Sequence, residues 1–374
     1  MKRIIFGAMA AVAMLACSKE QVIEVNRAND EISFNIVADN QTRAANVYCA
    51  NNLLPEFDVA ATYSDGTNTS WYFQNDHIVY QNSAWENTTT TRYWSTGTHD
   101  FYAIYNGTMT LTAVGAAPAL PTVDFTPAVS VDEQKDLLYA VATGKTKTTD
   151  AVVLNFRHAL SQIEFRAKNT NAQLYVEITG VRVGQTPGEG TFTYPTVSTA
   201  EQFVDHTQTN THSYTTGTWE VKTPTDYAVA FDAVEVEETD GVVSLTLSTD
   251  AKGETRDFAN SMLLLPATTN AWTPAKGETS FDGTYLAVNC KIYNVAGEKY
   301  QTGDVCLYNG WAAMPVAFDW QPGKKYIYTF IFGEGNGGYD DDPTDPEPVL
   351  TPISYTVTVD DFQKGYDADV EMKY

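Results

Sequence analysis

Side chains that could carry out acid–base, nucleophilic or metal chemistry are few, and their spacing does not assemble a site. The five histidines are His77, His99, His158, His206 and His212. His99 begins a strand pattern and His158 lies inside one, which is typical of structural histidines. The sequence has no GxSxG nucleophile motif, no CxxC pair and no Cys/His cluster. It therefore predicts no catalytic residue, no metal and no cofactor, and a protein that is not an enzyme.

The charge balance excludes one class of partner. The chain has 23 lysines and arginines against 47 aspartates and glutamates, a net charge of −24. Phosphate backbones attract basic surfaces, so we do not expect nucleic-acid binding. With 43% hydrophobic residues the chain can build real cores. At about 150 residues per domain, its length fits two units.

The first residues have the pattern of an export signal. MKR is a short basic region, and the apolar run of 13 residues at 4–16 is too short to span a bilayer. The run ends at Leu15-Ala16-Cys17, and a small residue directly before a cysteine resembles the lipidation box of bacterial lipoproteins. Met14 departs from the usual leucine. We expect acylation (palmitate) at Cys17 and a lipid anchor; the alternative is an ordinary secretory signal with an incidental cysteine.

An isolated arginine follows the first strand pattern after this leader. One face of that pattern carries Ile32, Phe34, Ile36 and Ala38. Arg43 is the only lysine or arginine between Arg27 and Arg92. Two interpretations fit. Arg43 is either a solvated loop residue, or a trypsin-like protease cuts the Arg43–Ala44 bond so that the strand before it can be removed.

The rest of the chain predicts an all-β fold. Short alternating runs rich in Thr, Val, Tyr, Phe and Trp are separated by Gly, Asn, Asp and Pro, and no segment sustains a period of 3.6. Close strand spacing with turn signals favours β-sandwiches. The polar GKTKTTD segment predicts a domain boundary near 145–151. We expect a pro-segment at 18–43, one β-sandwich at 44–148 and a second at 151–335.

The C-terminal part has two unusual segments. Residues 336–350 are rich in Gly, Pro and acidic residues, which predicts a flexible linker. Residues 351–374 then predict two amphipathic strands. Their apolar faces carry Ile353, Tyr355, Val357 and Val359 on the first, and Tyr366, Ala368, Val370 and Met372 on the second. Such faces must be buried, either on their own domain or on another subunit.

Three cysteines remain besides Cys17, and an exported chain permits a disulfide. Cys290 and Cys306 lie on neighbouring strand-like runs, so a bridge between them is one candidate. Cys49 is the third thiol, and three thiols allow three single pairings. The sequence does not choose among them.

The order and spacing of several segments resemble the fimbrillins of the Bacteroidales, which are type V pilins. The segments that carry the resemblance are LACSKE, ISFNIVADNQTRA, YWSTGTHDFYAIYNG, DLLYAVA, VVLNFRHALSQIEFRAK, WQPGKKYIYTFIFG and YTVTVDDFQKG. Together they span nearly the whole chain. The resemblance implies two transthyretin-like Greek-key β-sandwiches in series, exported as a lipoprotein precursor to the outer membrane. It also implies that an arginine-specific protease cuts Arg43–Ala44 and removes the strand from Ile32 to Ala38.

The resemblance further implies a structural subunit of a cell-surface fimbria that polymerises by strand exchange. The C-terminal strands of a neighbouring pilin subunit would fill the groove that the removed strand leaves. Two alternatives are a lipid-anchored accessory or tip adhesin of the same fold, and a surface glycan-binding lipoprotein. In the accessory or tip adhesin, two aromatic loops, WYFQ (71–74) and NGW (309–311), would bind a glycan or a host protein.

Overall fold

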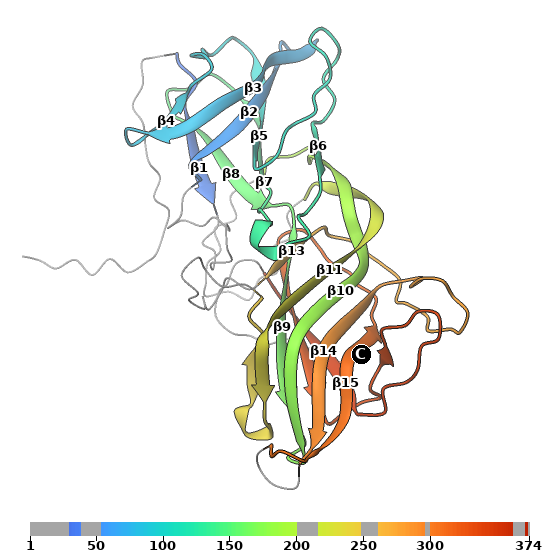
Figure 1. Cartoon of the computed structure of the whole chain (residues 1–374). Coiled ribbons are helices and arrows are strands. Elements are labelled where there is room, and N and C mark those ends of the chain that lie inside the picture. Colours follow the sequence, from blue (N-terminus) through green and yellow to red (C-terminus); the bar gives the residue numbers. More distant parts are fainter. Residues whose placement is uncertain are drawn as a thin grey trace, which may run out of the picture.

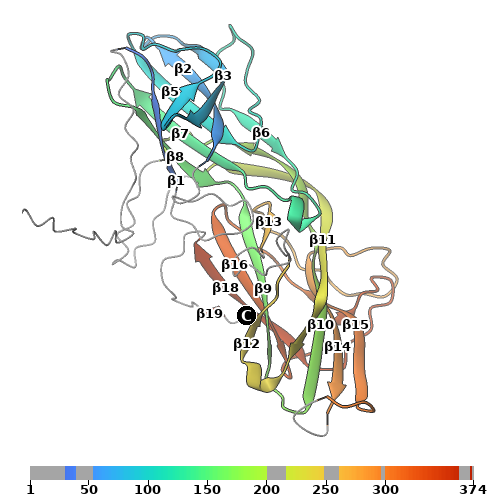
Figure 2. The same cartoon turned by 60° about the vertical axis from the view of Figure 1, so that its left-hand side comes forward.

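The computed structural model describes residues 30–38, 54–199, 216–247, 261–295, 300–361 and 371–372 (Figure 1). It confirms the all-β fold class. Within the described residues the helical segments are two single 3₁₀ turns, η1 (Val131–Glu133) and η2 (Glu238–Asp240). Two β-sheet units lie end to end, and a long β10–β11 ribbon connects them (Figures 1 and 2).

The first unit is one curved sheet with the strand order β1-β8-β7-β5-β2-β3-β4. Its strands are β1 (Phe34–Ala38), β2 (Glu56–Ser64), β3 (Thr69–Gln81), β4 (Ala84–Asn87), β5 (Thr98–Tyr105), β7 (Leu138–Lys145) and β8 (Val152–His158). β1 runs parallel to β8, and the other pairs are antiparallel. Glu31, three residues before β1, bridges to Tyr93, which follows β4, so the sheet nearly closes around its core.

Both faces of this sheet are buried. On β5, Phe101, Ala103 and Tyr105 face the core that the sheet encloses, whereas Tyr102 and Ile104 face a second core on its outer side. Burial of both faces explains why β5 reads as an almost continuous apolar run, since neither set of alternating side chains needs to be polar.

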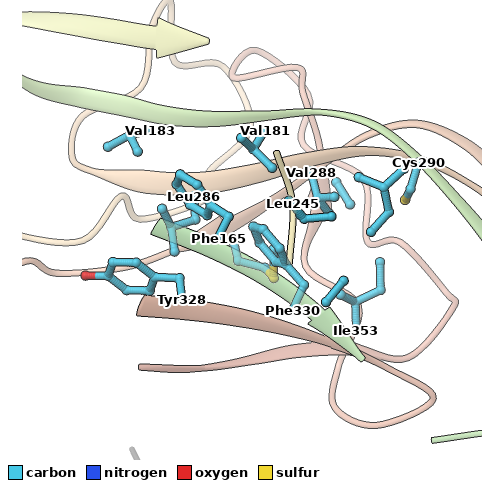
Figure 3. Close-up of a cluster of buried hydrophobic side chains, with 14 of the residues drawn as sticks. Phe165, Val181, Val183, Leu245, Leu286, Val288, Cys290, Tyr328, Phe330 and Ile353 are labelled. Carbon is cyan, nitrogen blue, oxygen red and sulfur yellow. The ribbon is translucent and has the colours of Figure 1, made fainter. Parts of the chain in front are cut away.

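The second unit is a sandwich of two sheets, β11-β10-β14-β15-β17 and β12-β9-β16-β18-β19, with β6 on β10 and β13 on β9. The strands are β6 (Thr122–Phe125), β9 (Ser161–Asn169), β10 (Leu174–Thr193), β11 (Thr218–Val236), β12 (Val242–Ser244), β13 (Met262–Leu264), β14 (Tyr285–Asn294), β15 (Val305–Pro315), β16 (Lys324–Phe332), β17 (Tyr339–Asp340), β18 (Ile353–Asp361) and β19 (Glu371–Met372). Side chains of both sheets interdigitate in one core (Figure 3). Phe165 of β9 stacks on Phe330 of β16 at 6.0 Å between ring centroids.

The two units share the second core of the first sheet. The end of the ribbon delivers Phe192 and Tyr194 to the outer face of β5 and β7. The ring of Phe192 lies 4.6 Å from that of Tyr139, and the Tyr194 hydroxyl donates a hydrogen bond of 2.9 Å to the carbonyl of Ala103. The ribbon is therefore part of both units and joins them by buried contacts.

The boundary expected near 145–151 is wrong. β8 pairs with β7 and β1, so the first sheet continues to His158, and after it the chain enters the second unit with β9 at Ser161. The second unit also takes β6 from the chain before β7. The GKTKTTD segment is the turn between β7 and β8. A hairpin turn and a domain linker have the same polar composition, so the sequence alone does not separate them.

The acidic segment at 336–350 is not a free linker. It contributes β17, in which Tyr339 and Asp340 pair with Ala313 and Ala312 of β15. Asp341 accepts hydrogen bonds of 2.8 and 2.7 Å at its two carboxylate oxygens from the Arg182 guanidinium. The segment thus follows the second unit closely on its way to β18.

One buried side chain and two glycines hold this segment against the sandwich. Val349 is 3% exposed in the core, whereas the next residue, Leu350, is 95% exposed. Gly337 and Gly338 have positive φ, and a Cβ on Gly337 would overlap the carbonyl oxygens of Val349 and Thr351. Lys276 also pairs with acidic side chains of the segment, but these groups are exposed and such pairs contribute little.

Docking of this segment can be tested with two adjacent substitutions. Val349→Ala should lower the free energy of unfolding by about 2 kcal/mol, because it removes two buried methyl groups. The matched control Leu350→Ala should change it by less than about 0.5 kcal/mol. Urea unfolding followed by tryptophan fluorescence measures both. Equally small effects would show that the segment is a free tether.

Candidate functional site

The expected removable strand is an integral part of the first core. Ile32, Phe34 and Ile36 are 5%, 3% and 4% exposed, respectively. The Phe34 ring packs edge-on against Phe57 and Phe101, with centroids 6.0 and 5.7 Å apart. Ala38 ends β1. Alternate side chains of β1 and of the residue Ile32 before it therefore enter a core whose other described members come from residues after position 53.

Backbone pairing holds the same segment on two sides. β1 pairs in parallel with β8 in the register Phe34–Val152 to Ala38–Phe156. On the other side, the Ile32 amide donates to the carbonyl of Arg92, and the Trp94 amide donates to the carbonyl of Asp30, both at 2.8 Å. The strand thus occupies a slot between β8 and residues 92–94. Its loss would leave unpaired backbone groups on both walls and an apolar stripe between them.

One wall of the slot is braced by a buried ion pair that does not involve β1. Asp76 is fully buried and accepts hydrogen bonds from Arg92 Nε at 2.7 Å and Arg92 Nη2 at 2.8 Å. Asn87 Nδ2 donates a third hydrogen bond to Asp76 at 2.7 Å. The hydrogen bond to Asp76 raises the pKa of Arg92, whose guanidinium also lies 5.0 Å from the centroid of the Phe73 ring. Residues 92–94 therefore keep their position through contacts independent of β1.

The sequence alone does not predict the ion pair between Asp76 and Arg92. Asp76 and Arg92 are separated by a strand and a loop, and neither stands in a motif. No local signal marks the pair, because Asp76 stands in β3 among the polar residues Gln74, Asn75 and His77.

The first C-terminal strand docks on its own chain. β18 pairs antiparallel with β16 from Phe332–Ile353 to Lys324–Asp361. Ile353 and Val357 are buried in the second core, and Tyr355 and Val359 pack against it. The four apolar side chains thus face one core, as their alternation predicts. β19 pairs Met372 with Val357, whereas Tyr366, Ala368 and Val370, which we predicted on the same apolar face, lie outside the described residues.

Three other expected sites also fall outside the described residues: the lipidation site Cys17 and the two residues of the expected cut, Arg43 and Ala44. β1 ends at Ala38 and the described chain resumes at Leu54, so Arg43 follows β1 and precedes β2. No helix among the described residues is long and apolar enough to cross a membrane. Nor do the described His, Cys, Asp and Glu side chains form a group of three that could hold a metal.

The aromatic segments considered as ligand-binding loops do not form loops. WYFQ lies in β3, where Trp71 and Phe73 are buried in the two cores of the first unit. NGW lies in β15, and the Arg182 guanidinium covers the Trp311 ring at 4.4 Å. Their polar, turn-like neighbours suggested loops, but both segments lie in strands. Trp71 and Phe73 are buried in the cores, and Trp311 packs against a smaller cluster.

The histidines that the structure describes have structural partners. His158 Nδ1 lies 2.7 Å from Asp136 Oδ2 in a buried pair, and His99 Nε2 lies 2.9 Å from the Ser95 hydroxyl. Burial lowers the pKa of His99, so its imidazole is neutral at pH 7. These contacts link neighbouring strands and loops.

The disulfide considered between Cys290 and Cys306 is not formed. Both are free thiols; Cys290 is buried in the second core and Cys306 is exposed. Their strands do pair, but Cys290 stands opposite Gly310 and Cys306 opposite Tyr293, which places the two cysteines out of register. Strand adjacency was predicted correctly, and the register excludes the bridge.

Alkylation distinguishes the two thiols. Burial raises the pKa of Cys290 to about 12, so at pH 8 its thiol is protonated as well as inaccessible. Iodoacetamide should modify Cys306 in the native protein and Cys290 only after unfolding in urea, as read by peptide mass spectrometry. Recovery of a cross-linked Cys290–Cys306 peptide from the non-reduced protein would contradict this register.

The contribution of β1 to the first core can be measured directly. Phe34→Ala should destabilise the first unit by about 3–5 kcal/mol, because it removes a fully enclosed ring. Tyr93→Ala is the control beside the same slot; Tyr93 is 57% exposed, and its loss should cost less than about 0.5 kcal/mol. Urea unfolding of the uncut chain gives both values. A Phe34→Ala protein as stable as the control would mean that β1 is dispensable for the core.

The chain has measurable similarity to known proteins. The model of the fimbrillin-like family matches residues 42–360. Similar solved structures include a candidate cell adhesion protein from Bacteroides uniformis, with 14% identity over 90% of this chain and 99% of that chain and a TM-score of 0.44. Another, from Parabacteroides distasonis, has 11% identity over 89% and 98% of the two chains and a TM-score of 0.48. A candidate adhesin from Bacteroides ovatus has 10% identity over 92% and 95% and a TM-score of 0.40.

No curated protein matches the chain significantly. The assignment to a family therefore rests on the sequence match, which covers most of both units and runs into β18. On that match, the chain belongs to the fimbrillin-like family.

Proposed function

We propose that this chain is a structural subunit of a cell-surface fimbria, exported as a lipoprotein and assembled by strand exchange after cleavage at Arg43–Ala44. Membership of the fimbrillin-like family supports a fimbrial or adhesive role at the cell surface. The observation that carries the finer proposal is the position of β1. It completes the first core, yet its covalent connection to the rest of that core runs through the segment that contains Arg43.

In this proposal, cleavage does not by itself empty the slot. Ile32, Phe34 and Ile36 each gain roughly 1.5–3 kcal/mol from burial, and the backbone pairing of β1 adds to this. A cut β1 therefore remains bound until another strand competes for the slot. Cleavage converts a covalently tethered strand into an exchangeable one, which lets an incoming strand displace it.

The competing strand must bring a comparable apolar face. β18 does so with Ile353, Tyr355, Val357 and Val359, but in the isolated chain this face is already buried. The segment from Tyr366 to Met372 has a similar alternation. We therefore consider two donors: β18, which would have to leave β16, and the segment after Asp361, which would leave the second core intact.

Exchange of this kind produces a filament. The slot lies in the first unit and the donor follows the second, so each subunit would receive a strand at one end and provide one from the other. Such a head-to-tail contact does not close on itself and propagates. The net charge of −24 keeps uncut subunits apart, because their surfaces repel one another. The lipid at Cys17 would hold the precursor at the outer membrane until cleavage.

A lipid-anchored accessory or tip adhesin of the same fold is the second candidate. The observation that favours it is that the first core is complete with β1 in place, so the uncut chain is a finished fold. Such a subunit would keep β1 and its anchor, and would require no cleavage at Arg43.

Digestion with an arginine-specific protease tests the proposal. The precursor should give one main new N-terminus at Ala44, followed by SDS-resistant multimers, with the β1 peptide released only as the multimers form. Mass spectrometry and gel filtration follow the two events. The control Arg43→Lys should resist this protease and stay monomeric. A cut product that remains monomeric would overturn assembly by strand exchange, and an Arg43 that is not cut would favour the anchored accessory.

Two truncations identify the donor. Removing 362–374 leaves β18 and the second core in place, whereas removing 352–374 also strips Ile353 and Val357 from that core. Loss of multimers in the shorter truncation assigns the donor to the terminal segment. Multimers that persist there and disappear only in the longer truncation assign it to β18, provided that its circular dichroism spectrum and unfolding transition remain those of a folded protein.

A further inference from the structure

A buried histidine packs against one wall of the slot that holds β1. His99 is the second residue of β5 and is 0% exposed. Its ring lies 5.3 Å from the Trp94 ring, and the Trp94 amide donates a hydrogen bond of 2.8 Å to the carbonyl of Asp30, just before β1. His99 Nε2 lies 2.9 Å from the hydroxyl of Ser95, the next residue of the wall segment. The imidazole therefore contacts the part of the wall that pairs with the chain entering β1.

Aromatic rings also connect His99 to β1 itself. The Phe101 ring, two residues further along β5, lies 6.2 Å from the His99 ring and 5.9 Å from the Trp94 ring. On its other side, Phe101 lies 5.7 Å from the ring of Phe34 in β1. Since protein cores are close-packed, a shift of His99 is felt by its neighbours. β1 and His99 thus rest on the same cluster of rings.

The surroundings of the imidazole accommodate its neutral form and not its charged form. Tyr63 of β2 and Tyr72 of β3 complete the cluster, with ring centroids 5.5 and 5.0 Å from that of His99. The hydroxyl of Ser95 is a neutral partner, and none of the described carboxylates forms an ion pair with His99. Aromatic faces attract a cation, but more weakly than water solvates it. Charging His99 inside this cluster is therefore costly.

Charged residues on the neighbouring elements do not remove this cost. Asp100 follows His99 in β5, and Lys145 pairs with His99 across β5 and β7. Burial lowers the pKa of His99, and the Lys145 backbone and the charge of Asp100 offset that effect only in part. The wall segment itself carries Arg92, whose guanidinium is positive and already paired with Asp76. The closed slot therefore holds His99 as a neutral imidazole.

We propose that His99 makes the slot sensitive to acid, so that its protonation favours states in which Trp94 and Ser95 move aside and β1 leaves the slot. Above pH 6.5, the ordinary pKa of histidine, the imidazole is neutral in both the closed and the open state. Below that pH the open state takes up a proton that the closed state does not, so the slot loses stability as the pH falls. This regulation would act on the proposed strand exchange, but it is a property of the uncut chain and does not depend on cleavage.

Hydrogen–deuterium exchange of the full, uncut chain tests the proposal. Exchange is read by mass spectrometry at pH 7.5 and pH 5.5 and corrected for the intrinsic pH dependence of amide exchange. We expect the opening of peptides that contain β1 and residues 92–95 to rise by up to about tenfold at the lower pH, the limit for one histidine that protonates only in the open state. Peptides of β14 in the second unit are the internal reference and should not change. Equal opening of β1 at both pH values, or an equal rise in β14, would overturn the proposal.

Three variants assign the effect to His99. His99→Phe and His99→Gln both lack the titrating group, so the rise should disappear in each, whatever its stability, because every variant is compared with itself at the two pH values. His77→Gln is the matched control: His77 is a half-exposed histidine of the same sheet, 2.7 Å from Asp58, and its loss should leave the rise intact. A rise that persists in a folded His99 variant would contradict the proposal. Because no step involves cleavage, such a result would leave the proposed strand exchange untouched.

Discussion

The first unit depends on one interaction, the insertion of β1 between β8 and residues 92–94. Ile32, Phe34 and Ile36 occupy the centre of a core that every other strand of the sheet surrounds. Without them the sheet would have an open edge on β8 and a hydrophobic groove, and such an edge readily pairs with another strand. The proposed strand exchange requires a strand that contributes to the core and is joined to it through a separate segment of the chain. The ion pair of Asp76 and Arg92 holds residues 92–94 through contacts that do not involve β1.

The second dependence is the burial of both faces of the first sheet. The inner face closes around its own core, and the outer face is covered by the end of the β10–β11 ribbon. The ribbon therefore connects the second sandwich to the first sheet through buried contacts. A strand exchanged into the slot would pair with β8, whose neighbour β7 contacts Phe192 and Tyr194. In the proposed filament, consecutive subunits would thus be connected through buried contacts and not through a loose joint.

The C-terminal region shows how an apparently unstructured composition can be ordered by distant residues. The acidic segment has few apolar side chains of its own, but β15 provides backbone partners, Arg182 binds Asp341, and Val349 enters the second core. These partners lie in other parts of the chain, so local composition does not reveal them. The docked segment therefore fixes where β18 begins, and hydrogen bonding to β16 fixes its register. Any use of β18 as a donor must therefore compete with this arrangement.

Patterns with a local cause were determined by the sequence alone. Alternation at residues 32–38 and 353–359 predicted strands with one buried face, because successive side chains of a strand point to opposite sides. The all-β class and the family resemblance came from the same kind of pattern. Tertiary structure alone decided which strands pair and in what register. It placed β8 in the first sheet, separated Cys290 from Cys306, buried Trp71 and Phe73, and docked the acidic segment. Each of these outcomes depends on contacts between residues far apart in the chain, whose free energy is set by the packing of the whole core and leaves no local trace in the sequence.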